Sequence, residues 1–201
     1  MSLPGTALIA ASEYLEIERK AEIKSEYING RMYAMSGASR RHNLIALNAG
    51  GEIRQQLRGR DCEAYAADMR VKVSPTGMYT YPDVVAVCGN PQFEDAHLDT
   101  LLNPTVLVEV LSESTEAYDR GEKFAHYRRL ESLREYVLVA QNKIRIEHYR
   151  RDGEEWVLSE ISDPHGTLHL PSIDCHVAVA AIYEKVEFEE SVTNPARREA
   201  S

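Results

Sequence analysis

Two acidic residues occupy positions at which the neighbouring sequence is almost wholly aliphatic. Glu109 lies within the run 105–111, and Asp83 heads the run 83–87 directly after Pro82. An ionised carboxylate among aliphatic side chains costs several kcal/mol unless a cation, a metal ion or a proton neutralises it. If the two runs form neighbouring strands, the carboxylates meet in the interior, where a divalent cation is the simplest remedy for their repulsion. The two acids therefore predict a metal site.

A lysine follows these acids at a distance that could bring it back to them. Lys123 and Tyr127 are four residues apart in a stretch expected to be helical, so they share one face of the helix. The run 105–111 leads into this helix through residues 112–115, which lets the helix fold back beside Glu109. A lysine in that place could neutralise a carboxylate or stabilise negative charge that develops on a phosphate.

Each of these residues also has an ordinary structural interpretation. Glu109 could pair with an arginine or lysine, Asp83 could cap a turn, and Lys123 could belong to the solvated face of an amphipathic helix. Other chemistries find less support, because the histidines lack HxH or HExxH spacing and the chain contains no P-loop, GxGxxG or GxSxG motif.

The elements that would position the site follow from local patterns. Asn29-Gly30 tolerates the positive φ angles of a type I′ turn, which predicts a hairpin with Glu26 opposite Tyr33. We expect helices over 12–20, with Ser12 as its cap, and over 39–57, 119–130 and 177–183. We expect further strands over 69–73, 83–87, 105–111, 135–139, 143–149 and 156–161.

These elements predict an α/β (α+β) fold in which a mixed sheet is flanked by helices. In the helix 119–130, Asp119 and Glu122 have the spacing of a capping box. A chain of 201 residues corresponds to about one domain, which we place at 1–186, and the charged segment 187–201 reads as a flexible tail.

Composition limits the class of protein. With 43% hydrophobic and 27% charged residues, the chain is expected to be globular, and its net charge of −9 excludes a generic basic coat for nucleic acid. No apolar run is long enough for a membrane span, and the start of the sequence lacks the pattern of an export signal. Cys62, Cys88 and Cys175 are odd in number and widely spaced, which predicts unpaired cysteines in a reducing, cytoplasmic environment without membrane contact.

The sequence resembles the Uma2 (DUF820) family over roughly residues 10–185. The order and spacing of several segments carry this resemblance: 25–30 (SEYING), 41–42 (RH), 68–71 (DMRV), 81–85 (YPDVV), 107–115 (LVEVLSEST), 119–123 (DRGEK) with Tyr127, and 134–139 (REYVLV). The family is grouped with the restriction-endonuclease-like PD-(D/E)xK nucleases. The resemblance therefore implies a restriction-endonuclease-like core, with a mixed central β-sheet flanked by helices, an N-terminal hairpin and C-terminal strands.

The resemblance also implies roles for the acids. Asp83 would be the acid of the PD element and Glu109 the second acid, while Leu111 stands where these nucleases usually carry their lysine. Residues i and i+2 of a strand share a face, so a lysine at that position would point where Glu109 points. Lys123 is the natural substitute, as the family's DxxxK segment suggests.

The implied activity is that of a metal-dependent endonuclease acting on DNA, with a water bound to Mg²⁺ as the nucleophile. Asp83, Glu109 and the backbone carbonyl of Val110 would hold Mg²⁺, with Mn²⁺ as a substitute, and Glu26 is a further candidate ligand or base. Lys123 would orient the water or stabilise the pentavalent phosphate.

His42, near the start of the helix 39–57, could transfer a proton or contact a phosphate. By analogy, a homodimer would supply one site for each DNA strand. Two alternatives remain open from the sequence: a degenerate nuclease that binds nucleic acid or a protein partner without cleavage, and a structural protein in which Glu109 simply pairs with Lys123.

Overall fold

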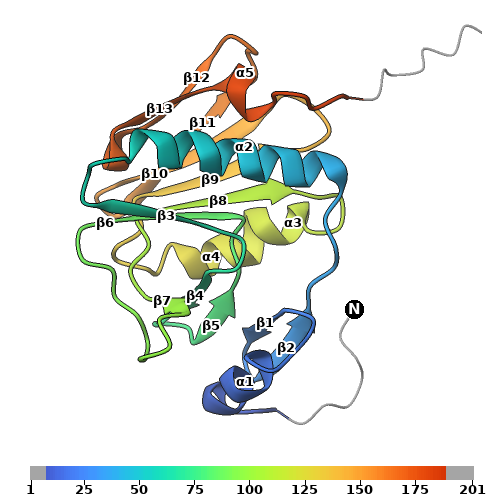
Figure 1. The fold of residues 1–201 in the computed structure, drawn as a ribbon, viewed down its shortest axis with the longest axis vertical. Helices are drawn as coiled ribbons and strands as arrows, with labels where there is room; N and C mark the ends of the chain where they lie inside the picture. Colours follow the sequence, from blue (N-terminus) through green and yellow to red (C-terminus); the bar gives the residue numbers. More distant parts are fainter. Residues whose placement is uncertain (1–7, 189–201) are drawn as a thin grey trace, which may run out of the picture.

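A six-stranded mixed sheet forms the centre of the structure, a computed structural model that describes residues 8–188 (Figure 1). Its order is β11-β10-β9-β8-β6-β3, and only β8 and β9 run parallel to each other. The strands are β3 (Cys62–Ala66), β6 (Val84–Cys88), β8 (Val106–Leu111), β9 (Glu135–Ala140), β10 (Ile146–Asp152) and β11 (Glu155–Ile161). Every residue of β8 and β9 is buried, as expected for central strands covered on both faces.

Two layers cover this sheet. Helix α2 (Arg40–Gln56) packs Ile45, Ala49 and Ile53 against one face, together with the two-stranded sheet β12 (Thr167–Leu170) and β13 (Cys175–Ala178). The other face packs against the segment that contains α3 (Glu116–Tyr118), a π-helix (Asp119–Lys123) and α4 (Phe124–Tyr127). The 3₁₀ turn Pro171–Ile173 and α5 (Val179–Ile182) complete the C-terminal part (Figure 1).

A second, five-stranded sheet carries the N-terminal hairpin toward this core. Its order is β2-β1-β5-β4-β7, formed by β1 (Ser25–Ile28), β2 (Arg31–Ala34), β4 (Arg70–Val73), β5 (Met78–Thr80) and β7 (Thr100–Leu101), with α1 (Ala11–Glu18) beside it. The predicted hairpin is confirmed: Glu26 lies opposite Tyr33, and Asn29 and Gly30 have φ angles of 49° and 81°. Because β1 pairs with β5, this sheet places Glu26 beside Thr80.

Several predicted element ends were wrong. Ser12 lies inside α1, whose N-cap is Ala10 and whose start has no side-chain cap. Asp119 does not cap a helix, because the helical segment already begins at Glu116 and Asp119 opens the π-helix within it. The expected helix 177–183 is β13 followed by the single turn α5, since alternate residues of β13 are buried, a period of two. Strands β3, β5, β7 and β12 were not predicted.

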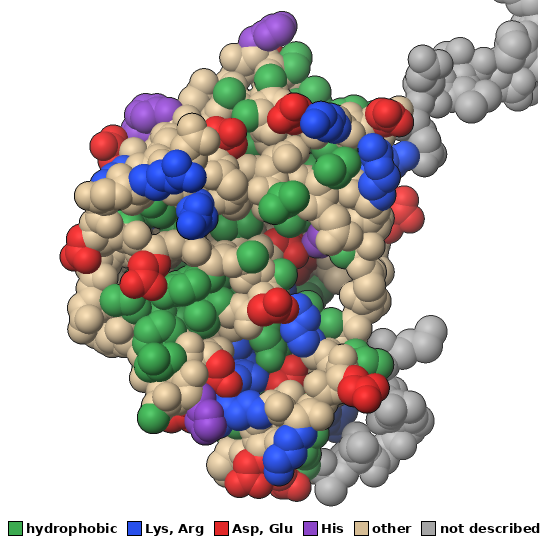
Figure 2. Space-filling model, viewed as in Figure 1, with side chains coloured by type: hydrophobic (Ala, Val, Ile, Leu, Met, Phe, Trp, Pro, Cys, Tyr) green, Lys and Arg blue, Asp and Glu red, His purple; other side chains and the backbone are tan. Residues whose placement is uncertain are grey.

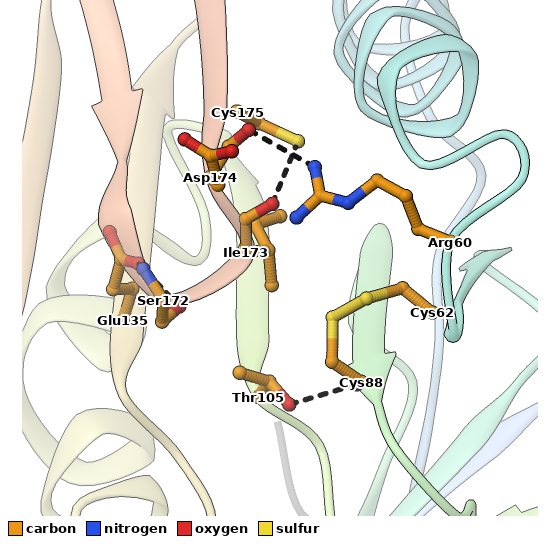
Figure 3. The surroundings of a disulfide bond; sticks show 9 residues. All are labelled: Arg60, Cys62, Cys88, Thr105, Glu135, Ser172, Ile173, Asp174 and Cys175. Carbon is orange, nitrogen blue, oxygen red and sulfur yellow. Dashed lines mark hydrogen bonds between the residues drawn. A yellow bond between two sulfur atoms is a disulfide. The ribbon is translucent and has the colours of Figure 1, made fainter.

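The cysteine prediction was also wrong. Cys62 and Cys88 are directly opposite each other on β3 and β6 and form a disulfide, whereas Cys175 is a free, buried thiol (Figure 3). The sequence separation of 26 residues gave no local sign of this pairing, which depends on the register of two antiparallel strands. The expectation of a reducing environment rested on unpaired cysteines and loses that support.

No helix among residues 8–188 is both long and apolar enough to cross a bilayer. The predicted boundary at 186/187 stays a prediction, because most of the segment 187–201 lies outside the described residues.

Replacing both Cys62 and Cys88 by alanine should lower the free energy of unfolding by about 3 kcal/mol. A disulfide that closes a loop of 26 residues restricts the unfolded chain by roughly this amount. Urea unfolding followed by circular dichroism measures it. Dithiothreitol should bring the wild type to the level of the double variant and leave the variant unchanged, and equal stability of the oxidised wild type and the variant would contradict the prediction.

Candidate active site

Two adjacent strands of the central sheet position the predicted acids. Strands β6 and β8 are antiparallel with Val84 opposite Val108, so Asp83 and Glu109 occupy the next pair of positions in that register. The prediction that the two aliphatic runs are neighbouring strands is confirmed. Glu109 is 4% exposed, so its carboxylate lies within the protein interior.

Two groups hold the Asp83 carboxylate in place. Its Oδ2 accepts a hydrogen bond from the backbone N–H of Val110 at 2.7 Å, and its Oδ1 lies 2.9 Å from Nε2 of His42. Ser39 caps α2 by accepting a hydrogen bond from the His42 N–H, which fixes His42 in the first turn of that helix. Since the N–H and C=O of one strand residue point to the same edge, the Val110 carbonyl also lies on the edge that faces Asp83.

Lys123 lies between acids that come from three separate segments. Its Nζ is 2.9 Å from Oε1 of Glu109, 3.0 Å from Oε1 of Glu26 and 3.7 Å from Oδ1 of Asp119. The Lys123 side chain is only 7% exposed, so this contact is an interior ion cluster. The structure thus brings Lys123 beside Glu109, and it brings the further candidate Glu26 from the hairpin to the same ammonium group.

Asp119 is a member of this cluster that the sequence reading missed. Its spacing of four residues from Lys123 could have indicated this contact, but the sequence pattern was interpreted as a capping box with Asp119 as the helix cap. The π-helix Asp119–Lys123 has both residues at its ends, and both are buried. Such wide helical turns are often found at functional sites.

A pair of hydroxyl groups links the two glutamates. Tyr127 donates a hydrogen bond to Oε1 of Glu109 at 2.8 Å, and its hydroxyl is 3.1 Å from Oγ1 of Thr80. Thr80 in turn donates a hydrogen bond to Oε1 of Glu26. Tyr127 was predicted to share the face of Lys123, whereas nothing in the sequence pointed to Thr80.

Burial and mutual repulsion control the charge of this cluster. Burial raises the pKa of Glu109 well above its usual range, and the charges of Asp119, Asp83 and Glu26 raise it further against the opposing effect of Lys123. Burial likewise raises the pKa of Asp119. Burial alone would lower the pKa of Lys123, but Glu109, Glu26 and Asp119 raise it well above the usual range. The lysine is therefore a stable ammonium, whereas burial favours the protonated forms of Glu109 and Asp119.

The donor set suits a hard cation that needs few protein ligands. The described residues contain no cluster of three or more His, Cys, Asp or Glu side chains that could hold a metal ion. Mg²⁺, however, is usually held by one or two carboxylates together with waters and substrate phosphate. Asp83, the facing Val110 carbonyl and Glu109 provide oxygens of that kind, whereas Oε1 of Glu26 contacts Lys123 and Thr80.

Comparison with known proteins shows the family to which the chain belongs. The family model of Uma2, described as "Putative restriction endonuclease", matches residues 11–180. The chain belongs to the Uma2 family. Two uncharacterized proteins of Synechocystis sp. (strain ATCC 27184 / PCC 6803 / Kazusa) are similar to this Uma2 protein. The protein sll1609 is 35% identical over 80% of this chain and 92% of its own length, and slr1290 is 36% identical over 90% and 94%.

A solved structure shows the same fold. The crystal structure from Anabaena variabilis ATCC 29413 described as "a putative nuclease belonging to DUF820" superposes with a TM-score of 0.71. It covers 87% of this Uma2 protein and 97% of the other chain, with 17% sequence identity, so the likeness concerns the fold alone. The predicted fold class, a mixed sheet with flanking helices in a nuclease-like arrangement, is confirmed.

Replacing Glu109 by glutamine tests whether the carboxylate stabilises the fold. Because burial raises the pKa of Glu109 above its unfolded value, the ionised form is disfavoured in the folded state. The wild type should therefore lose stability relative to Glu109→Gln as the pH rises from below the ordinary carboxyl range, and at pH 7 the variant should be at least as stable. If the carboxylate is a structural partner of Lys123, the variant should instead lose about 3–5 kcal/mol. Urea unfolding between pH 4 and 8 distinguishes the two results.

Proposed function

We propose that this Uma2 protein is a metal-dependent endonuclease that hydrolyses phosphodiester bonds of DNA. The observation that supports the proposal is that Asp83 and Glu109 occupy opposite positions on adjacent antiparallel strands, while Lys123 from the following helix lies 2.9 Å from Glu109. The family description and the structural likeness support a nuclease-like fold. DNA as substrate, Mg²⁺ as cofactor and the individual residue roles are parts of the proposal.

Asp83, Glu109 and the Val110 carbonyl would hold Mg²⁺, with Mn²⁺ as a substitute. Such a bound ion lowers the pKa of a coordinated water and withdraws charge from the phosphate. His42 and the Val110 N–H each hold one oxygen of the Asp83 carboxylate in place. Tyr127 fixes the Glu109 carboxylate through its hydroxyl hydrogen.

Lys123 is assigned to the reacting phosphate. Its raised pKa keeps it protonated, so it can stabilise negative charge that develops on the phosphate oxygens. Glu26 and Glu109 hold its ammonium group in the interior before substrate binds. Glu26 would therefore act first as a positioning residue. His42, whose Nε2 lies beside Asp83, would pass a proton to or from the substrate.

DNA contact must be local, because the protein has a net charge of −9. The face shown in Figure 2 has acidic and basic side chains interspersed and no continuous basic surface. A homodimer would provide two sites for the two strands of a duplex. The homodimer and a location in the cytoplasm are further parts of the proposal.

One observation favours a second candidate, a nuclease fold that binds nucleic acid or a protein partner without cutting. The ammonium of Lys123 already contacts both glutamates, so the cluster could be complete without a metal ion. An interior ion cluster of this type would neither bind Mg²⁺ nor respond to it.

Asp83→Asn should reduce Mg²⁺-dependent cleavage of plasmid DNA at least about 100-fold, the usual scale for loss of a group that acts in the transition state. The amide oxygen can still accept from the Val110 N–H, so the variant should fold. The matched control is Asp68→Asn, whose side chain is 94% exposed and pairs with Lys24 outside the site. Nicking and linearisation are measured on gels, and a fully active Asp83→Asn would rule out the assignment.

Mg²⁺ or Mn²⁺ should raise the melting temperature of the wild type, because a ligand that binds only the folded state stabilises it. At a hundredfold excess over the dissociation constant the gain is about 2.7 kcal/mol. Differential scanning fluorimetry with Mg²⁺, Mn²⁺ and EDTA measures the shift. Asp83→Asn should lose it and Asp68→Asn should keep it. No shift and no cleavage in the wild type would favour the non-cutting alternative.

A further inference from the structure

A hollow of about 830 Å³ lies at the carboxyl ends of the parallel strands β8 and β9. It is lined by the start of α2, by the segments that follow β8 and β9, and by Phe188. In open sheets with parallel strands, ligands bind in crevices outside the carboxyl ends of the strands. The hollow adjoins the site along the chain, because Arg41 precedes His42 and Leu111 is two residues after Glu109.

From this position and from its lining, we infer that the hollow binds one unstacked nucleotide of the substrate strand, next to the phosphate that is cut. This inference rests on the proposed nuclease function and extends it to the form of the substrate. The partner is a single strand, or a nucleotide extruded from a duplex.

The size of the hollow suits a single nucleotide. Its volume is within the range of about 300–1,000 Å³ that is typical of pockets for small molecules. A duplex keeps its bases paired inside the stack, so enzymes that enclose a base act on single strands or turn the nucleotide out. Only an unstacked nucleotide can place a base in a hollow of this size.

The lining supplies partners for each part of a nucleotide. Arg40 and Arg41, at the start of α2, line the hollow and carry cationic groups of the kind that bind a phosphate. Phe188 and Leu111 provide apolar surface against which a base can lie. Asn142 carries an amide, which can both donate to and accept from the edge of a base.

Acidic groups around the hollow limit which ligands it can bind. Glu116 forms ion pairs with Arg120 and Arg145, so its charge is already compensated. Glu113 and Glu187 also line the hollow, and their charge disfavours a ligand with many phosphates. A single nucleotide unit of a strand, with one phosphate at the arginines and a neutral base beyond, fits this balance better than a run of backbone phosphates.

The test uses the full-length protein in EDTA, so that binding is measured without cleavage. A single-stranded oligonucleotide with one 2-aminopurine reports an unstacked base by its fluorescence, and its anisotropy gives the affinity. We expect the fluorescence to change on binding, and a fully paired duplex to bind more weakly. Arg40→Gln should weaken binding about tenfold or more, as expected for the loss of a hydrogen bond to a charged group. The matched control is Arg54→Gln, an exposed arginine in the last turn of the same helix, which should leave affinity within about twofold.

Asn142→Ala tests the base separately from the phosphate. It should weaken binding of the intact oligonucleotide and leave unchanged the binding of one with an abasic position in place of 2-aminopurine. Equal losses for Arg40→Gln and Arg54→Gln would show general charge attraction and overturn the inference, as would equal effects of Asn142→Ala on both oligonucleotides. Cleavage by the wild type in Mg²⁺ is scored independently. Cleavage without these binding effects would refute the inference and leave the nuclease proposal standing, whereas these binding effects without cleavage would refute the nuclease proposal alone.

Discussion

One ammonium group in the interior holds together parts of the chain that are far apart in sequence. Lys123 contacts Glu26 from the N-terminal hairpin, Glu109 from the central sheet and Asp119 from its own helical segment. Removing this cation would leave several buried carboxylates without a counter-charge, which is far more costly than any single hydrogen bond of the cluster. The contact that joins strand β1 to the central sheet is therefore part of the candidate active site, and it adds to the hydrophobic packing of β4, β5 and β7 against β6 and β8. The same ion cluster thus serves both the packing of the fold and the candidate active site.

The helical segment after β8 has the geometry that this ion cluster requires. Asp119 and Lys123 stand at the two ends of the π-helix, both are buried, and Nζ of Lys123 lies 3.7 Å from Oδ1 of Asp119. The next turn then brings the Tyr127 hydroxyl to Glu109, and Thr80 continues the contact to Glu26. These neutral hydroxyls let two acidic side chains lie close together without a second cation. Catalytic groups in nucleases face the same requirement, since acids must be kept near one another until substrate and metal arrive.

Sequence reasoning reached those features that local patterns determine. The Asn29-Gly30 hairpin, the capped helix α2 and the buried strands β6 and β8 follow from turn chemistry and hydrophobic runs, and with them the meeting of Asp83 and Glu109. It failed where the pairing of strands that are distant in sequence determines the structure. Strand β3 is short and only partly buried, so its sequence has no strong period, and the Cys62–Cys88 pair exists only because of its register with β6. Thr80 was missed for the same reason, because it joins the site through the pairing of β5 with β1.

The disulfide between β3 and β6 has a consequence for the integrity of the site. It closes a loop that contains β4, β5 and the residue Asp83, and both ends of this loop lie on paired strands of the central sheet. A protease that cut the backbone at the exposed turn around Ser74 and Pro75 would therefore leave two fragments that remain covalently joined. The strand that follows Asp83 would stay beside its neighbour, and the nicked protein would separate into two pieces only under reducing conditions.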